Sequence, residues 1–378
     1  MGTQEIKRNK KALAVFTGGG TGGHVYPGIA VIERLREVRE GEVLWIGSRG
    51  GMEKDIVESW ASRIPGITYK EIPSGKLRRY FSLKNFTDIF RIARGFFAAL
   101  WIFLKRRPAV VFSKGGYVSF PPVFAAWLLR VPVITHESDL DPGLATLLNA
   151  PFAKKICVPY EESAAHFPAR FRKKLVVTGN PVRREIFSGK AEEGLRLTGF
   201  SGAKPIVFVL GGSLGAQEIN ALVRAALDEL LPVCDIVHQT GEGKYEDISR
   251  PGYFAAPYFT GELPHILAAA CAVVSRAGAG SLWEFLAAQK PALLIPLRGP
   301  GTRGDQLRNA ALFERMGAAD VLSGDAITHE AFAAAVKALI EPSRREAMLG
   351  AIRRAAGHDG KDAAGLCAAM ILEYAKES

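Results

Sequence analysis

Cysteine is scarce in this sequence and thinly spread. The chain of 378 residues has four cysteines, and no two of them form a Cys-x-x-Cys pair. This spacing argues against a disulfide framework and against a cysteine-based zinc site, and it suits a reducing compartment. No group of His and Cys has the spacing of metal ligands, so we expect no bound metal and no cofactor.

Long hydrophobic runs are also missing. The longest strongly apolar stretch, Phe96–Leu104, is far shorter than the ~20 residues that a membrane-spanning helix needs. The first residues, MGTQEIKRNKK, are polar and lack the apolar region of a secretory signal. We therefore expect neither a membrane span nor export.

Acidic residues are outnumbered, and the imbalance is local. The chain has 49 Lys and Arg against 38 Asp and Glu, a formal net charge of +11. Residues 76–107 alone hold nine Lys and Arg, one Asp and eight aromatic residues. Aromatic side chains can enter the membrane interface, while each basic residue near an anionic surface contributes about 1 kcal/mol. The segment predicts reversible contact with an anionic membrane through Lys76, Arg78, Arg79, Phe81, Lys84, Phe86, Phe90 and Trp101.

Two other interpretations of residues 76–107 stay open. The segment could be a core helix with a solvated basic face, and some of its aromatic residues must pack inward. Nucleic acid is the rival partner for a basic protein. The sequence has neither a helix-turn-helix nor a stacking-sheet signature, so we expect no nucleic acid.

Short apolar runs alternate with helical patterns along the chain. Runs such as ALAVFT, VLWIGS and AVVFSKG are almost continuously hydrophobic, as are strands buried on both faces of a parallel sheet. Helical stretches such as GIAVIERLREVRE lie between the runs, so the pattern predicts βαβ units and an α/β fold. The pattern restarts after a polar, glycine-containing linker at 185–204, and two domains suit this chain length.

We therefore predict two Rossmann-like, doubly wound domains with parallel sheets. The first covers residues 1–184, and the second covers 185–357. The last stretch, 358–378, is predicted to form a C-terminal helix that packs back on the N-terminal domain.

Each predicted domain opens with a strand, a glycine-rich loop and a helix. FTGGGTGGH covers residues 16–24, and LGGSLGAQ covers residues 210–217. Such loops point backbone N–H groups and the positive end of a helix at one spot, which favours phosphate. Two loops in matching positions indicate two phosphorylated ligands. The alternative is that the glycines only make tight strand–helix turns.

The first loop formally matches a dinucleotide fingerprint. Gly18, Gly20 and Gly23 have the G-x-G-x-x-G spacing, but the next predicted strand ends in Ser48 and Arg49 rather than in an acidic residue. That ending disfavours NAD. The sequence also has no G-x-x-x-x-G-K-[ST], which excludes an ATPase P-loop.

Seven motifs appear in a fixed order between Gly18 and Asn309. They are GGGTGGHVYPGIAV, SKGGYVSFPP, THESDLDPGLA, GNPVR, GGSLGAQ, SRAGA followed by Glu284, and Gln306 with Asn309. Together they resemble the MurG family of glycosyltransferases. The resemblance implies a GT-B fold, in which two Rossmann-like domains face each other across a cleft.

The resemblance also implies a reaction and a place. The reaction is an inverting, metal-independent transfer of N-acetylglucosamine from UDP-N-acetylglucosamine to the 4-hydroxyl of N-acetylmuramyl-pentapeptide on undecaprenyl diphosphate, a step of peptidoglycan synthesis. The acceptor and the membrane would bind to the N-terminal domain, and the nucleotide sugar to the C-terminal domain. The implied place is the cytoplasmic face of the bacterial inner membrane, on its anionic inner leaflet.

The residues and the resemblance together assign a site. His24 is the predicted general base, because imidazole is the simplest base at neutral pH, with Asp139 and Glu137 in reserve. The acceptor diphosphate is assigned to Gly20, Thr21, Gly22, Gly23, Gly115, Gly116 and Tyr117. The donor is assigned to Asp139, Asn180, Arg183, Ser213, Leu214, Gly215, Arg276, Gly280, Ser281, Glu284, Gln306 and Asn309.

Some members of the donor set have specific expected roles. Arg183 and Arg276 would stabilise the charge of the departing UDP, with a structural ion pair as the alternative for each. Glu284 would accept hydrogen bonds from the two ribose hydroxyls. Gln306 and Asn309 would contact the sugar hydroxyls.

The sequence departs from the family pattern at two places. Gly280-Ser281 stands where the family usually has Leu-Thr, and Asp305-Gln306 stands where Gln-Gln is frequent, so one sugar contact is less secure. FTGELPHIL, expected near the uracil, matches only loosely, and no uracil contact is assigned. The glycine-rich stretch 298–306 is predicted to be a mobile loop that orders when the donor binds.

Some alternatives remain at this point. Asp139-Leu140-Asp141 has the Asp-x-Asp spacing that sugar transferases of another fold use for a metal, but the following Pro-Gly predicts a turn instead. Other functions stay open as well. They are a GT-B glycosyltransferase acting on a lipid such as diacylglycerol, a UDP-N-acetylglucosamine epimerase, and a membrane-bound UDP-sugar sensor without enzymatic activity.

Overall fold

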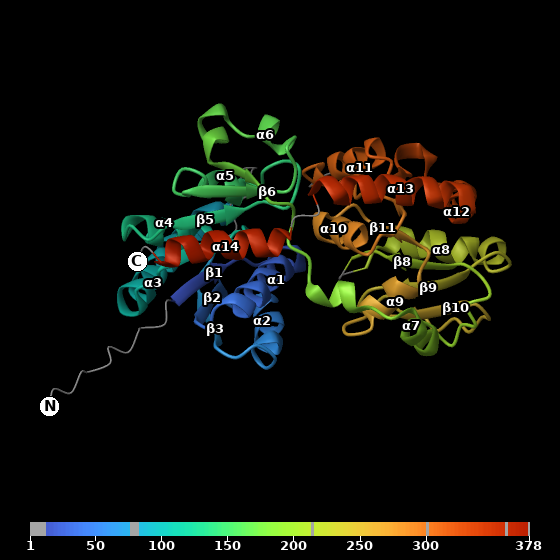
Figure 1. The fold of residues 1–378 in the computed structure, drawn as a ribbon, viewed down its shortest axis with the longest axis horizontal. Helices are drawn as coiled ribbons and strands as arrows, with labels where there is room; N and C mark the ends of the chain where they lie inside the picture. The colour runs from blue at the N-terminus through green and yellow to red at the C-terminus, as the bar shows by residue number, and fades with distance from the viewer. Residues whose placement is uncertain (1–12, 76–82, 213–214, 300–301, 360–361, 377–378) are drawn as a thin grey trace. The chain divides into compact units, whose positions relative to one another are not determined.

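The chain forms two compact units. The computed structural model describes residues 13–75, 83–212, 215–299, 302–359 and 362–376 (Figure 1). Unit 1 comprises the chain up to Glu137, Pro142–Pro181 and the C-terminal stretch from Asp362. Unit 2 comprises Val182–Lys361 together with the short stretch Ser138–Asp141, which lies inside the sequence of unit 1.

Unit 1 is built on a seven-stranded sheet in which every pairing is parallel. The strand order is β3-β2-β1-β4-β5-β6-β7. The strands are β1 (Leu13–Thr17), β2 (Glu42–Ser48), β3 (Ile67–Ile72), β4 (Val110–Ser113), β5 (Val133–His136), β6 (Lys155–Val158) and β7 (Leu175–Val177).

Helices connect these strands and cover the sheet of unit 1. They are α1 (Gly22–Val38), α2 (Glu53–Ala61), α3 (Leu83–Arg106), α4 (Phe120–Leu128), α5 (Leu144–Asn149), α6 (Ser163–His166), the 3-10 turn η1 (Ala169–Lys174) and α14 (Ala363–Lys376). The C-terminal helix α14 packs against α1, and Figure 1 shows it in red beside the blue and green elements of unit 1.

Both faces of this sheet are buried, and the strand sequences show why. In β1, Ala14 and Phe16 point into a core shared with α1, α2 and α14. Leu13 and Val15 point the other way, into a core shared with α3 and α4. Side chains alternate between the two faces of a strand, so a run of hydrophobic residues fills both cores.

Unit 2 repeats the arrangement with six parallel strands. Their order is β10-β9-β8-β11-β12-β13. The strands are β8 (Ile206–Leu210), β9 (Asp235–Gln239), β10 (Tyr253–Ala256), β11 (Ala272–Ser275), β12 (Ala292–Leu294) and β13 (Ala319–Val321). The helices and turns are η2 (Arg184–Ser188), α7 (Ala191–Thr198), α8 (Gln217–Leu230), α9 (Leu263–Ala269), α10 (Ala279–Ala287), α11 (Asp305–Arg315), η3 (Gly324–Ala326), α12 (His329–Ile340) and α13 (Pro342–Asp359).

The predicted fold class is confirmed: each unit is a parallel sheet with surrounding helices. Several predicted site residues lie outside the described residues. They are Lys76, Arg78, Arg79, Phe81, Ser213 and Leu214. The side chains of Lys84 and Phe86, in the first turn of α3, are also not described. Within the described residues, no helix has the length and hydrophobicity that crossing a bilayer requires.

Candidate active site

The strand order fixes where a ligand can bind in each unit. In a doubly wound sheet, ligands bind outside the carboxyl ends of the strands, at the point where the chain changes direction of travel across the sheet. In unit 1 this switch point lies between β1 and β4, and in unit 2 between β8 and β11. The predicted loops at 18–23, 115–117 and 211–216 follow β1, β4 and β8. The predicted donor residues Arg276, Gly280 and Ser281 follow β11, so predicted site residues follow all four strands.

The two glycine loops of unit 1 touch each other. A Cβ added at Gly116 would lie 2.3 Å from the carbonyl oxygen of Gly19, and one at Gly20 would lie 2.9 Å from the ring of Tyr117. Both glycines have positive φ values, +77° for Gly116 and +89° for Gly20, which other residues rarely adopt. The predicted acceptor site takes residues from both loops, and the structure brings the two loops into contact.

Two of the predicted phosphate-binding amides already have partners within the chain. The amide of Gly20 donates to Oε2 of Glu53 at 3.2 Å, and that of Gly115 donates to Oγ of Ser113 at 3.3 Å. The amides of Gly22 and Gly23, in the first turn of α1, have no carbonyl partner inside the helix. The N-cap residue Thr21 is exposed, and its own side chain makes no capping hydrogen bond. The anion site predicted here therefore depends mainly on the start of α1.

His24 lies in that first turn and is held by a backbone group. Its Nδ1 is 3.1 Å from the carbonyl oxygen of Lys114, which can only accept a hydrogen bond. Nδ1 therefore carries the proton in the neutral ring, and Nε2 is the basic nitrogen. The ring lies beside Gly115, where a Cβ would be 3.8 Å from Nδ1. This arrangement suits the predicted role of His24 as a general base.

Lys114 is a buried cation at the switch point that sequence reasoning missed. Its side chain is 2% exposed, and Nζ lies 2.7 Å from Nδ1 of His136 and 3.4 Å from Oδ1 of Asn180. His136 donates through Nε2 to the carbonyl of Gly179, so Nδ1 accepts from the lysine. Burial lowers the pKa of His136 well below its usual value, and the charge of Lys114 lowers it further. The only local sign was a lysine directly before two glycines.

The reserve base Glu137 is also engaged within unit 1. Its Oε2 accepts hydrogen bonds from the amide of Gly143 at 2.8 Å and from the hydroxyl of Thr146 at 2.6 Å. These contacts fasten the start of α5. Asn180, assigned to the donor from the sequence, is 1% exposed and lies in the same unit, at Lys114.

In unit 2, the described part of the predicted diphosphate loop is pressed against the end of β9. A Cβ at Gly215 would lie 2.0 Å from the carbonyl oxygen of Thr240, and Lys244 donates through Nζ to the carbonyl of Gly215 at 3.0 Å. Asn220 of α8 donates to the carbonyl of Thr240 at 2.9 Å. The start of α8 is thus set beside β9 by contacts that only glycine allows at residue 215.

A buried histidine, His238, contacts Asn220 of α8 and so helps to position this loop. His238 donates through Nε2 to Oδ1 of Asn220 at 3.1 Å and accepts at Nδ1 from the hydroxyl of Tyr253 at 2.9 Å. Burial, helped by the charge of Arg224, lowers the pKa of His238 to about 4. The ring is therefore neutral at physiological pH, and its two hydrogen bonds fix its tautomer.

Two predicted donor residues bind each other. Arg183 contacts Oε1 of Glu284 through both Nε, at 2.9 Å, and Nη2, at 2.8 Å. The side chains are 10% and 17% exposed. Burial raises the pKa of Glu284, while Arg183 opposes that rise. Both guanidinium nitrogens use the same carboxylate oxygen of Glu284 on α10.

Arg276 has an ion-pair partner at the start of α8. Its Nη1 lies 2.8 Å from Oε2 of Glu218, and it donates to the carbonyl of Ile295 at 2.9 Å. This is the structural pairing that the sequence left open beside a role at UDP. Gly280 and Ser281 lie in the first turn of α10, which follows β11 and therefore begins at the switch point of unit 2.

The residues predicted to contact the sugar hold a loop in unit 2. Asn309 is 1% exposed, donates to Oδ1 of Asp139 at 3.1 Å and accepts from the amide of Leu140 at 3.2 Å. Arg303 contacts the other oxygen of Asp139 at 2.8 Å. Gln306 accepts from the amide of Leu297 at 2.8 Å. Their predicted contacts with sugar hydroxyls stay predictions.

The Asp-x-Asp triplet is engaged by arginines. Arg303 pairs with Asp139, and Arg308 pairs with Asp141. Over the ranges that the structure describes, no three His, Cys, Asp or Glu side chains are grouped as metal ligands.

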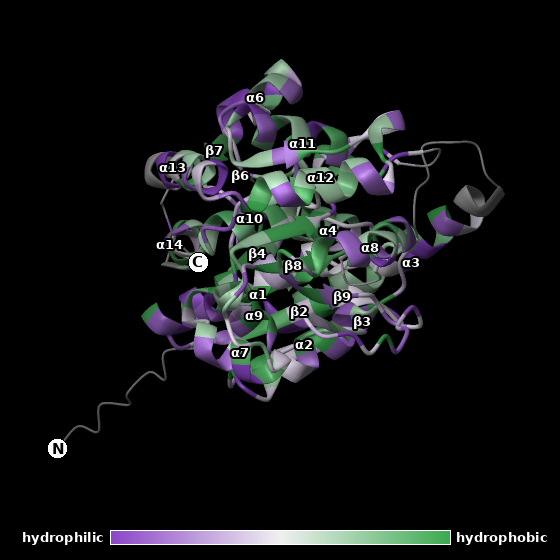
Figure 2. Cartoon of the chain, turned by 90° about the vertical axis from the view of Figure 1, so that its right-hand side faces the viewer, coloured by the Kyte–Doolittle hydropathy of each residue, from purple (hydrophilic) through white to green (hydrophobic). Residues whose placement is uncertain are grey.

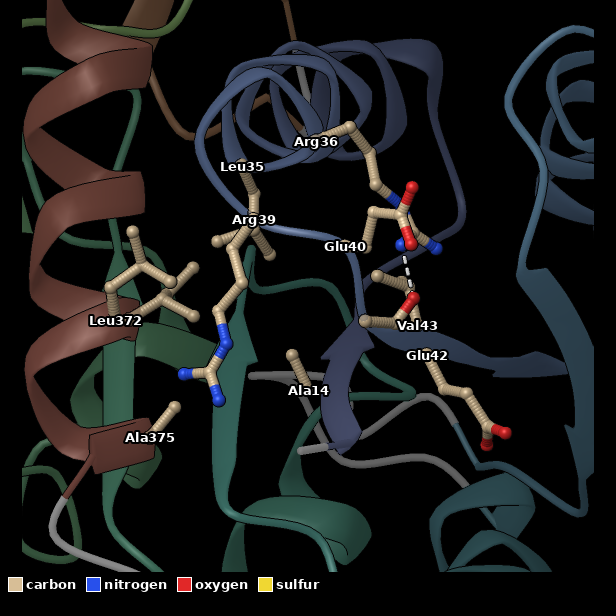
Figure 3. Close-up of a pocket in the computed structure, with 11 residues that line it drawn as sticks. Ala14, Leu35, Arg36, Arg39, Glu40, Glu42, Val43, Leu372 and Ala375 are labelled. Carbon is tan, nitrogen blue, oxygen red and sulfur yellow. Dashed lines mark hydrogen bonds between the residues drawn. The ribbon is translucent and has the colours of Figure 1, made fainter. Parts of the chain in front are cut away.

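A small hollow in unit 1 lies away from these loops. It is lined by residues near the amino ends of β1 and β2 and near the carboxyl ends of α1 and α14. The switch point lies at the other end of these strands. Figure 3 shows Arg36 there, with Nη1 donating to the carbonyl of Gly41. None of the predicted site residues lines this hollow.

The two halves of the chain match two halves of one family. The glycosyltransferase family 28 N-terminal domain matches residues 14–158, and the family 28 C-terminal domain matches residues 206–363. The chain belongs to glycosyltransferase family 28. The second match begins at Ile206, the first residue of β8 and of the second parallel sheet.

Relatives of this family 28 chain have informative names. A protein of Treponema denticola is 43% identical over 84% of this chain and 85% of its own length, and one of Bacillus cereus is 49% identical over 82% and 86%. Both are named UDP-N-acetylglucosamine–N-acetylmuramyl-(pentapeptide) pyrophosphoryl-undecaprenol N-acetylglucosamine transferases. The crystal structure of MurG from Acinetobacter baumannii has a TM-score of 0.71, with 23% identity over 96% of this chain and 99% of its own. At that identity the structural likeness shows the shared GT-B fold.

Proposed function

We propose that this family 28 chain transfers N-acetylglucosamine from UDP-N-acetylglucosamine to the lipid-linked N-acetylmuramyl-pentapeptide in peptidoglycan synthesis. The observation that carries the proposal is the identity of 43% and 49% to relatives with that name, over more than four fifths of the chain. Two glycine-rich switch points, one in each unit, supply a place for each diphosphate that the reaction needs.

The donor binds in unit 2 in this proposal. The start of α8 faces the diphosphate, since helix N-termini favour phosphate. Glu284 offers Oε2 to the ribose hydroxyls, because Oε1 is already used by Arg183. The guanidinium of Arg183, held close to the nucleotide, also stabilises the negative charge that develops on the departing UDP.

The acceptor binds in unit 1. Its diphosphate lies at the start of α1, on the amides of Gly22 and Gly23. The 4-hydroxyl oxygen of the muramyl sugar attacks the anomeric carbon of N-acetylglucosamine as the bond from that carbon to the UDP oxygen breaks. The hydroxyl proton passes to Nε2 of His24, and UDP leaves with the bond's electron pair. One displacement of this kind inverts the anomeric centre and gives a β-1,4 link.

Unit 1 also carries the surface that we assign to the membrane. On α3, Phe90, Phe97 and Trp101 are 59%, 65% and 61% exposed and share one face at helical spacing. Figure 2 shows this helix with both hydrophobic and hydrophilic positions along its length. Basic residues flank the aromatic ones, and Nζ of Lys105 lies 4.4 Å from the ring of Trp101. Phe103 is 1% exposed and packs into the core instead.

We place the protein on the cytoplasmic face of the bacterial membrane, where an anionic leaflet attracts this basic, aromatic helix face. Exposed aromatic side chains alone would also suit a protein partner. The surrounding positive charge favours the membrane.

Competing acceptors test the proposal directly. The purified chain, given labelled UDP-N-acetylglucosamine, is offered the lipid-linked muramyl-pentapeptide and diacylglycerol in the same vesicles. We expect label only on the muramyl lipid. Label on diacylglycerol, or conversion of the donor to its 2-epimer without transfer, would replace the proposed function with one of its rivals.

A further inference from the structure

A fully buried carboxylate lies under the first glycine loop. Glu53, the first residue of α2, is 0% exposed. Its Oε1 accepts hydrogen bonds from the amide of Ser48, at 2.7 Å, and from the Ser48 hydroxyl. Its Oε2 accepts from the amide of Gly20 at 3.2 Å. The next residue, Lys54, pairs with Glu71 instead, and the N–H and O–H donors and the positive end of α2 favour a carboxylate at residue 53.

Three glycines make room for this carboxylate. A Cβ at Gly19 or at Gly51 would lie 2.4 Å from a carboxylate atom, and one at Gly47 would lie 2.8 Å from Cγ of Glu53. Real Cβ atoms do not come so close to other heavy atoms. Part of the glycine content of this region is therefore required by Glu53 rather than by a ligand.

The same carboxylate is connected to the second glycine loop through Ser48. The hydroxyl of Tyr117 donates to Oγ of Ser48 at 3.1 Å, and that Oγ donates to Glu53. The Tyr117 ring also lies against Gly20, the residue whose amide Glu53 holds. Glu53 thus fixes the Gly20 loop directly and the Tyr117 loop through one intervening hydroxyl.

We propose that Glu53 is a positioning residue for the acceptor site: it closes the Gly20 amide to the ligand and sets the separation of the two glycine loops. This inference rests on the proposed function, because it assigns the loops to the acceptor diphosphate. An anion then meets the amides at the start of α1, next to His24, rather than the middle of the loop.

The chemistry calls for a carboxylate rather than an amide. Both oxygens of Glu53 accept from N–H or O–H donors. Glutamine has nearly the same shape, but its NH2 group would face a donor whichever way it turned. Glu53→Gln therefore removes one acceptor with little change in volume, and the loop on the NH2 side loses its anchor.

Acceptor and donor kinetics separate this role from a general structural one. We expect Glu53→Gln to raise KM for the lipid-linked acceptor or lower kcat at least ~10-fold, consistent with loss of positioning. KM for UDP-N-acetylglucosamine, which binds to the other unit, should stay within about two-fold of wild type. Glu58→Gln, on the exposed side of the same helix, is the matched control and should behave as wild type.

Coupling between the loops gives a second readout. Tyr117→Phe removes only the hydroxyl that reaches Ser48. The transfer activity of the Glu53→Gln/Tyr117→Phe double variant should therefore be little lower than that of the more impaired of the two single variants. Independent, multiplying losses would overturn the inference, as would unchanged acceptor kinetics in Glu53→Gln. If Glu53→Gln does not fold, Ser48→Ala tests the same connection, since it keeps the backbone amide and removes the hydroxyl. Absence of transfer by the wild-type chain would instead refute the proposed function.

Discussion

His24 donates a hydrogen bond through Nδ1 to the backbone carbonyl of Lys114, over 3.1 Å. The two residues are 90 positions apart in sequence, one after β1 and the other directly after β4. The contact joins the two strands at the switch point of unit 1 and leaves Nε2 as the basic nitrogen. A backbone carbonyl cannot be removed by mutation, so the orientation of the ring is part of the fold.

Replacement of His24 should affect the chemical step. We expect His24→Ala to lower turnover by roughly 10²–10⁴-fold, the usual contribution of a general base. UDP should bind as before, because His24 lies in unit 1. Steady-state transfer rates and calorimetric UDP binding measure the two effects. His329→Ala, at an exposed histidine of unit 2, is the control and should turn over as wild type does. Full turnover in His24→Ala would exclude His24 as the base.

Replacement of Arg183 should reduce the stability of unit 2. Arg183→Met leaves the mostly buried carboxylate of Glu284 without its cation, which costs about 3 kcal/mol at neutral pH. Burial already raises the pKa of Glu284, and loss of Arg183 raises it further. A carboxyl whose folded pKa lies above its unfolded pKa stabilises the fold at low pH and loses that contribution as pH rises. The deficit should therefore be larger at pH 8 than at pH 5.

Thermal unfolding of wild type and Arg183→Met across that pH range checks this prediction. Arg196→Met is the matched control, because Arg196 pairs with Glu193 on the exposed surface and is 75% exposed. A deficit in Arg183→Met that is independent of pH would show that Glu284 is not the group left uncompensated.

His238 should make the fold sensitive to mild acid. Its pKa is lowered to about 4 in the folded state, so between about pH 6.5 and pH 4 the unfolded chain binds a proton that the folded chain does not. Stability is thus present above pH 6.5 and is lost as pH falls, by about 2 kcal/mol at pH 5. Denaturant unfolding at pH 7 and pH 5 measures the loss.

The comparison with His238→Gln isolates this group. Glutamine can still donate to Asn220 and accept from Tyr253, but it does not titrate. Burial also lowers the pKa of His136, so the wild-type curve contains both contributions, and only the difference between the two proteins reports on His238. Parallel curves for the two proteins would contradict the assignment.

The exposed face of α3 should govern attachment to vesicles. Phe97→Ser and Trp101→Ser each remove an aromatic side chain that would enter the interface, so each should weaken binding to anionic vesicles about ten-fold or more. Co-sedimentation at fixed salt measures the change. Phe187→Ser removes an equally exposed aromatic, 66% exposed, from unit 2 and should bind as wild type. Equal losses in all three variants would remove α3 as the contact.

The sequence predicted the central strands of both sheets and missed three strands at sheet edges. The predicted apolar runs ALAVFT and AVVFSKG contain β1 and β4, which are central strands buried on both faces. β3, β10 and β13 lie at the edges. In β3 only Ile67 and Ile72 are buried, so its middle is polar and gives no continuous hydrophobic run.

Within the site, local motifs predicted the loops but not the contacts between them. The dinucleotide fingerprint calls for an acidic residue at the end of β2, where this chain has Ser48. Glu53, five residues later in the sequence, accepts a hydrogen bond from the amide of Ser48. Its contact with Gly20 spans 33 residues, and no periodicity or composition signals such a pairing. Sequence motifs identified Asn309 and Arg276 as site residues. The motifs did not predict that these side chains bind Asp139 and Glu218 in the folded chain.

Transfer in the presence of EDTA tests the central claim most directly. The purified chain is mixed with labelled UDP-N-acetylglucosamine, vesicles containing the lipid-linked muramyl-pentapeptide, and excess chelator. The account predicts that the label moves to the lipid as a β-1,4-linked sugar at a rate unaffected by EDTA. Intact binding of UDP-N-acetylglucosamine with no transfer to that lipid would contradict it.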